Sequence, residues 1–157
     1  MCRAALVCLF LVLALSAWSD DESLEARVHA VLDQTPLIDG HNDLPYVYTL
    51  RARGHLDEMP FTDDLTKIDQ PTHTDLTRLR DGRVGGQFWS VYIPIKAYPG
   101  APGDTTQVLR QIDLVHRLIE RHPDALALAL TSEDIRRIHK SRKILIRNVA
   151  QFHGILP

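Results

Sequence analysis

Cysteine is nearly absent from this chain of 157 residues: Cys2 and Cys8 are the only two, and both lie at the amino terminus. If the first residues are removed as a leader, the remaining chain contains no thiol. Disulfide bonds, a cysteine nucleophile and a cysteine zinc site are then excluded. A catalytic metal ion would have to be held by histidine, aspartate or glutamate.

Charge of either sign is also not in large excess. The chain has 18 Lys and Arg against 20 Asp and Glu, a formal net charge of -2, although no acid follows Asp134. This balance does not favour nucleic acid or an anionic membrane as a partner. The length suits one domain but is short for a complete (β/α)₈ barrel, which needs about 250 residues.

One long apolar run is present, over residues 4–17, between the positive Arg3 and the acids at 20–22. A positive start, an apolar middle and a polar flank are typical of a secretory signal peptide. We expect residues 1–19 to form such a peptide, cleaved near Ser16 or Ser19. The run is shorter than the about 20 residues of a transmembrane helix, so an uncleaved membrane anchor is the less favoured alternative.

Helix and strand patterns alternate along the rest of the chain. Apolar residues at helical spacing predict helices at residues 20–34 and 104–121. A short helical turn is expected at residues 74–81, and the Thr131 hydroxyl three residues before Asp134 predicts the start of another helix. Short apolar runs predict strands at residues 37–43 and 84–94. The run at residues 125–130 fits a helix or a strand by composition, and its place between two predicted helices favours a strand. Prolines and acids make residues 44–75 loop-rich. This order predicts an α/β fold with a parallel sheet and outer helices, either an α/β barrel or a doubly wound sheet.

The most informative pattern is His41-x-Asp43, at the end of a predicted buried strand. Side chains two residues apart on a strand point to the same side. At the carboxyl end of a barrel strand that side faces the active-site mouth. We therefore predict His41 and Asp43 as ligands of one divalent metal ion, with Asp39 on the same side to orient His41. For so short a motif, an ordinary polar pair is the alternative.

A second pattern is Gly85-Gly86-Gln87-Phe88-Trp89-Ser90. Its glycines allow a ligand or another backbone to approach closely. Gln87 or Trp89 would then line a pocket, whereas packing of Phe88 and Trp89 in the core or at an interface is the reading we favour. The pattern assigns no catalytic residue and no substrate-binding residue.

Three stretches, in this order, resemble the membrane (renal) dipeptidase family: residues 38–45 (IDGHNDLP), 72–80 (THTDLTRLR) and 82–94 (GRVGGQFWSVYIP). The resemblance runs from about residue 24 to 140. It implies a (β/α)₈ barrel with two zinc ions that hydrolyses dipeptides. The family's His-x-Asp motif, which ligates one zinc ion, corresponds to His41 and Asp43.

The resemblance also implies how the chain divides. Residues 20–140 would form the amino-terminal part of the barrel, its first three to four β/α units, and residues 141–157 a divergent basic tail. The family's bridging glutamate and its later histidine ligands have no counterpart in this sequence. We therefore expect at most a partial zinc site, in a chain shortened by a frameshift, a truncated gene or alternative splicing.

The function expected from the resemblance is a zinc-dependent dipeptidase, inactive as this chain stands. The alternative is a non-catalytic secreted fragment that acts as a binding partner or regulator, and a weaker one is another barrel metallohydrolase. A dipeptide substrate and a homodimer are the expected partners, with no nucleic acid. We expect a secreted protein, periplasmic or extracellular. Many relatives are membrane-associated, but no apolar lipid-anchor signal is read at this carboxyl end.

Overall fold

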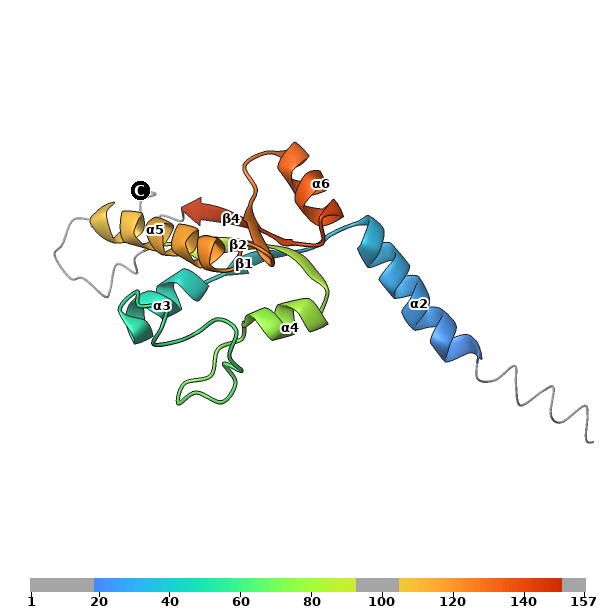
Figure 1. Ribbon diagram of the computed structural model, residues 1–157, viewed down its shortest axis with the longest axis horizontal. Helices are drawn as coiled ribbons and strands as arrows, with labels where there is room; N and C mark the ends of the chain where they lie inside the picture. Colours follow the sequence, from blue (N-terminus) through green and yellow to red (C-terminus); the bar gives the residue numbers. More distant parts are fainter. Residues whose placement is uncertain (1–18, 93–104, 151–157) are drawn as a thin grey trace, which may run out of the picture. The chain divides into compact units, whose positions relative to one another are not determined.

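The computed structural model describes residues 19–92 and 105–150 (Figure 1). The chain divides into two compact units, and the division falls after Thr35. The first unit contains helix α2 (Ser19–Gln34), which confirms the helix predicted over residues 20–34. The apolar run at 4–17 lies outside the described residues. In the part of the chain that is described, no helix is long and apolar enough to cross a membrane.

The second unit is built on one parallel sheet of four strands in the order β1-β2-β4-β3. The strands are β1 (Leu37–Asn42), β2 (Val84–Val91), β3 (Leu126–Leu128) and β4 (Ile144–Ala150). The helices that connect them are α3 (Leu44–Ala52), α4 (Leu76–Asp81), α5 (Thr105–Arg121) and α6 (Ser132–Lys140). The parallel sheet and the intervening helices confirm the predicted α/β class.

Helix α3 lies in the region that the sequence predicted to be loop-rich. Pro45 stands in its first turn, where proline costs no hydrogen bond because the first amides of a helix have no partner within it. Tyr48 is buried on the inner face of this helix and donates a hydrogen bond from its hydroxyl to the carbonyl of Met59, at 2.7 Å. Burial raises the pKa of that phenol. Proline was thus a helix-start signal here.

Strand β4 lies inside the sheet, between β2 and β3, although the sequence pattern predicted no strand beyond residue 130. It pairs with β2 from Gly86↔Leu145 to Val91↔Ala150. Its three consecutive aliphatic residues are all buried: Ile144, Leu145 and Ile146. A run that is apolar on both faces is what a central parallel strand requires. The basic residues around it hid this short run.

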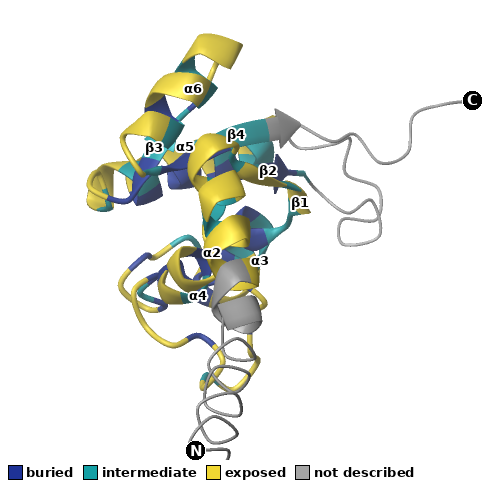
Figure 2. Ribbon diagram, turned by 90° about the vertical axis from the view of Figure 1, so that its right-hand side faces the viewer, coloured by how far each residue is buried: buried dark blue, intermediate teal, exposed yellow. Residues whose placement is uncertain are grey.

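The strand order places helices on both faces of the sheet. The chain steps outward from β1 to β2 and past β4 to β3, then returns through α6 to β4. Because parallel crossovers are right-handed, the reversed step carries α6 to the opposite face. Leu145 points to that face and packs with Ile138 of α6 and Ala129. Figure 2 shows α6 exposed along most of its remaining surface.

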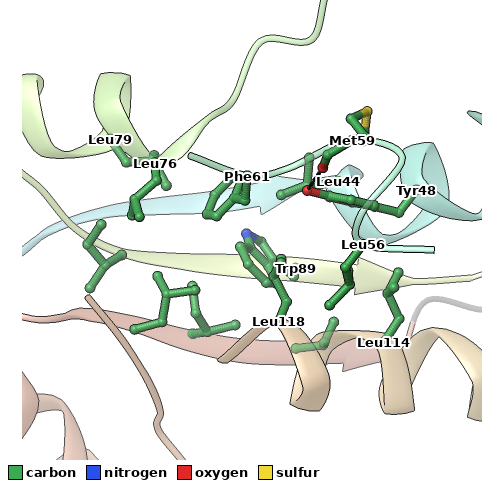
Figure 3. Packing of buried hydrophobic residues seen from close by; sticks show 14 of the residues in the cluster. Leu44, Tyr48, Leu56, Met59, Phe61, Leu76, Leu79, Trp89, Leu114 and Leu118 are labelled. Atoms are coloured by element: carbon green, nitrogen blue, oxygen red, sulfur yellow. Dashed lines mark hydrogen bonds between the residues drawn. The ribbon is translucent and has the colours of Figure 1, made fainter. Parts of the chain in front are cut away.

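The main core lies on the other face, under α3, α4 and α5. Trp89 of β2 is fully buried at its centre and meets Phe61 edge-on, with ring centroids 6.0 Å apart (Figure 3). Leu114 and Leu118 of α5 belong to the same buried cluster, and Figure 3 shows Leu118 beside Trp89. Trp89 is therefore a core residue, as the favoured reading of the Gly85–Ser90 pattern had it.

Candidate metal centre

The carboxyl ends of β1 and β2 carry the polar residues that the sequence singled out. His41 is the penultimate residue of β1, and Asp43 occupies the position just before α3. The imidazole Nε2 of His41 lies 3.1 Å from Oδ1 of Asp43, with the two side chains 48% and 41% exposed. The structure thus brings the two predicted ligands together at a solvent-accessible edge of the sheet.

A β-bulge in β1 decides where His41 points. Asp39 pairs with Gln87 and Asn42 pairs with Trp89. Between these two pairs β1 advances by three residues and β2 by two, so β1 contains one extra residue. The extra residue breaks the ordinary alternation of side chains between the two faces. The Asp39 carboxylate therefore contacts the Gln87 side chain, while the His41 ring contacts Ser90, which points to the opposite face of β2.

Asp39 does not share a side with His41 in the way that simple alternation predicts. Its Oδ1 accepts a hydrogen bond from the main-chain N–H of His41 at 3.2 Å, and its Oδ2 accepts one from Nε2 of Gln87 at 2.7 Å. The indole N–H of buried Trp89 in turn donates to Oε1 of Gln87 at 2.8 Å. This chain of bonds ties the backbone of His41 to the core.

Ser90 supplies the contact to the ring. Its Oγ lies 3.3 Å from Nδ1 of His41, on the side of the imidazole away from Asp43. Serine, histidine and aspartate are the residue types of a nucleophilic triad. However, Ser90 is only 1% exposed within β2, so no substrate carbonyl can reach its hydroxyl. The arrangement holds an imidazole in place and does not present a nucleophile.

The backbone around Asp43 is held by neighbouring polar groups. The side chain of Asn42 donates to Oγ1 of Thr74 at 2.6 Å and accepts from the N–H of Leu44 at 3.0 Å. These bonds attach the end of β1 to the segment that leads into α4, within the resemblance motif at residues 72–80. Sequence reasoning missed Asn42 and Thr74, because a bond between residues 32 positions apart leaves no local signal.

The end of β2 is fixed in the same manner. Gln111 of α5 is fully buried and makes two bonds to Tyr92: its Oε1 accepts from the main-chain N–H at 3.0 Å and its Nε2 donates to the carbonyl at 2.7 Å. The Tyr92 ring stacks at a tilt on Tyr46, with centroids 5.1 Å apart. Burial, together with the nearby negative charge of Asp43, raises the pKa of the Tyr92 phenol.

The donor atoms at this edge fit a divalent cation. Oδ1 of Asp43 is buried and has no hydrogen-bond donor, although Nε2 of His41 lies 3.1 Å away. Two ligand atoms about 2.0–2.2 Å from a tetrahedral zinc ion lie about 3.3 Å apart, close to this separation. Among the described residues, no group of three His, Cys, Asp or Glu side chains could hold a metal ion. Among the described residues, the metal-binding side chains at this edge are therefore two, His41 and Asp43.

Comparison with known proteins gives the family. Residues 25–149 match the membrane dipeptidase family, peptidase family M19. The chain belongs to this family. The match includes most of β4, beyond the residue 140 at which the resemblance read from the sequence stopped. The dipeptidase ataJ of Aspergillus terreus is 37% identical over 124 residues, which are 75% of this chain and 29% of that protein.

Solved structures show the same fold. A metallopeptidase from Rhodobacter sphaeroides, bound to a phosphinate mimic of the dipeptide L-Ala-D-Ala, matches 74% of this chain and 38% of its own, at 18% identity and a TM-score of 0.55. The probable dipeptidase PvdM from Pseudomonas aeruginosa matches 79% and 30%, at 17% identity and a TM-score of 0.56. The dipeptidase-family sheet described above is thus similar to part of these barrels, and the chain spans about a third of its relatives' length.

Proposed function

We propose that this dipeptidase-family chain carries half of a metal site for the hydrolysis of dipeptides, and that the metal ion is zinc. The observation that carries the proposal is the pair His41 Nε2 and Asp43 Oδ1, 3.1 Å apart with no hydrogen bond to the carboxylate oxygen. Imidazole nitrogen and carboxylate oxygen are both ordinary zinc ligands. Family membership supports a metallopeptidase.

In this proposal the chain's own residues bind and orient. His41 and Asp43 hold the ion, the bonds from Asp39 and Asn42 fix the backbone on either side, and Tyr92 flanks the carboxylate. A bound zinc ion supplies Lewis acidity and lowers the pKa of its water. A catalytic zinc site needs about three protein ligands and a water. We propose that this chain, with two such donors among its described residues, is by itself inactive toward dipeptides.

The substrate class in this proposal is a dipeptide. The Rhodobacter sphaeroides relative binds a mimic of L-Ala-D-Ala, which makes that dipeptide the first compound to test. We also propose that the chain is secreted, on the basis of its amino-terminal sequence pattern. Light scattering of the purified chain tests the predicted homodimer, and sequencing of the amino terminus of material exported by a secretory host tests the cleavage.

The site is tested by calorimetric titration of the full chain with zinc. An assay of L-Ala-D-Ala hydrolysis is made on the same proteins. We expect weak binding of about one ion per chain, lost in His41→Ala and in Asp43→Ala. His116→Ala removes an exposed imidazole from α5 and should bind as the unaltered chain does. Equal binding by all four proteins would refute the site.

The hydrolysis assay separates the two functions that remain. Zinc binding without hydrolysis supports the second candidate, a non-catalytic binding partner or regulator, which the two-donor site favours. Hydrolysis that needs both His41 and Asp43 would show that further groups complete the site and would overturn the proposed inactivity.

A further inference from the structure

We propose that Pro45 is a positioning residue for this site: because it has no backbone N–H to offer at the start of α3, the Asp43 carboxylate stays directed toward His41. The observation that carries the inference is an aspartate at the cap position of a helix whose side chain caps no amide. The inference rests on the proposed function only where it makes Asp43 a metal ligand.

Asp43 begins α3 with its backbone but not with its side chain. Its carbonyl accepts a hydrogen bond from the N–H of Val47 at 3.1 Å, as the cap residue of a helix does. A carboxylate at this position ordinarily accepts the N–H of the second or third helical residue as well. Here the side chain makes no such bond, and its Oδ1 lies 3.1 Å from Nε2 of His41 instead.

The caps of two other helices show the arrangement that Asp43 does not adopt. Asp75 before α4 and Thr131 before α6 have extended backbones, with ψ 169° and 165°, and each side chain accepts the N–H of the third helical residue. Asp43 has φ −90° and ψ 17°, which lies between the helical and the extended regions. Its carboxylate is therefore not committed to the end of the helix.

The neighbours of Asp43 leave it little to cap. Pro45 is the second residue of α3, and proline has no N–H. The N–H of Leu44, the first residue, is already accepted by Oδ1 of Asn42 at 3.0 Å. Asn42 is held for this task because its Nδ2 donates to Oγ1 of Thr74 at 2.6 Å. An N–H restored at position 45 would offer the carboxylate a hydrogen bond that competes with a metal ion.

The experiment is a double-variant cycle in urea on the full, metal-free chain. Asp43→Ala should change the unfolding equilibrium constant little in the unaltered chain, because an exposed pair with His41 contributes little. In Pro45→Ala the restored N–H should recruit the carboxylate. Adding Asp43→Ala there should then raise the unfolding constant about fivefold, as the loss of an ordinary cap does. Pro60→Ala is the matched control, at a proline outside the helices, and Asp43→Ala should have no larger effect in it than in the unaltered chain.

Zinc affinity is the second readout, because a carboxylate that caps a helix must be released before it can bind the ion. By linkage, Pro45→Ala should bind zinc more weakly by the same factor of about five, and Pro60→Ala should bind as the unaltered chain does. Equal effects of Asp43→Ala in all three backgrounds overturn the proposal, as does undiminished zinc binding by Pro45→Ala.

The two readouts also separate this role from the metal function. An effect of Asp43→Ala that appears only with Pro45→Ala, in a chain that binds no zinc, supports the role of Pro45 and refutes the metal function. Should Pro45→Ala fail to fold, Pro45→Val restores the same N–H and fills more of the space of the buried ring.

Discussion

Gly86 of β2 lies directly against the side chain of Leu145 of β4. A Cβ atom added to this glycine would stand 2.3 Å from Cγ of Leu145 and 2.5 Å from its Cδ1. Leu145 is fully buried and points to the face that α6 covers. The bare backbone of Gly86 is therefore the surface on which the central leucine packs, and this contact explains one of the two adjacent glycines in the sequence.

Gly86→Ala should destabilise the chain by about 2 kcal/mol, because a methyl group forced into a packed core displaces its neighbours. Leu145→Ala should cost about 3 kcal/mol by leaving a cavity. In the double variant the methyl group added at position 86 fills part of the space that the shortened residue 145 leaves. The loss of unfolding free energy should therefore be about 1 kcal/mol less than the sum of the two single losses. Urea denaturation measures all three. Gly40→Ala, with nothing within 4 Å of the added atom, is the control, and additive losses would contradict the contact.

Asp75→Ala should cost about 2 kcal/mol of unfolding free energy. Asp75 is 1% exposed and caps α4: its Oδ1 accepts from the N–H of Arg78 at 2.9 Å, and its Oδ2 from the N–H of Leu65 at 3.2 Å and from Nε of Arg78 at 2.7 Å. Denaturant melts check the loss. Asp64→Ala, which breaks an exposed pair with Lys67, should change little, and equal losses in the two variants would be inconsistent with a buried cap.

His122 should make the fold less stable in mild acid. Burial, with the nearby positive charges of Arg121 and Arg80, lowers the pKa of this imidazole, and its Nε2 is buried without a hydrogen-bond partner. The unfolded chain then binds a proton more readily than the folded chain. The contribution to stability is complete above the unfolded pKa of about 6.5 and declines as the pH falls below it.

Melting temperatures at pH 7.5 and pH 5.5 test this sign. The drop between the two should be smaller in His122→Gln than in the unaltered chain, and unchanged in His116→Gln, whose imidazole is exposed on α5. A drop of the same size in His122→Gln would assign the acid sensitivity to other groups.

Strand β1 should promote association of the isolated chain. It forms an edge of the described sheet, and Leu37 and Ile38 on it are 46% and 37% exposed. Exposed apolar edge strands pair with other chains, and a charge on such a strand blocks the pairing. Leu37→Lys should therefore raise the concentration at which light scattering detects aggregates. Leu109→Lys, at a residue 58% exposed on α5, should raise that concentration less. A larger effect of Leu109→Lys than of Leu37→Lys would show that the associating surface is not the edge strand β1.

Much of the outline follows from local sequence. The helices α2 and α5 and the strands β1 and β2 were predicted from hydrophobic spacing close to their observed bounds. The predicted start of α6 at Thr131 is confirmed as a capping box, in which the Thr131 hydroxyl accepts from the N–H of Asp134 at 3.1 Å. Local rules suffice there because the partners are three residues apart.

Proximity within the candidate site also follows in part from sequence. His41 and Asp43 are two residues apart at the junction of a strand and a helix, so the short spacing keeps their side chains near each other. Their role as metal ligands stays a prediction, as do the cleavage of residues 1–19 and secretion. The type of chemistry was readable because few residue types bind zinc.

Only the tertiary structure decided how that pair is held. The bulge in β1 appears only when the register with β2 is set, and it turns His41 toward Ser90 while Asp39 turns toward Gln87, partners 49 and 48 residues away. The place of β4 inside the sheet was likewise hidden, because basic neighbours obscure a short apolar run until strands on both sides bury it. Local patterns record which residues prefer a strand or a helix, whereas register and strand order depend on contacts that no local pattern contains.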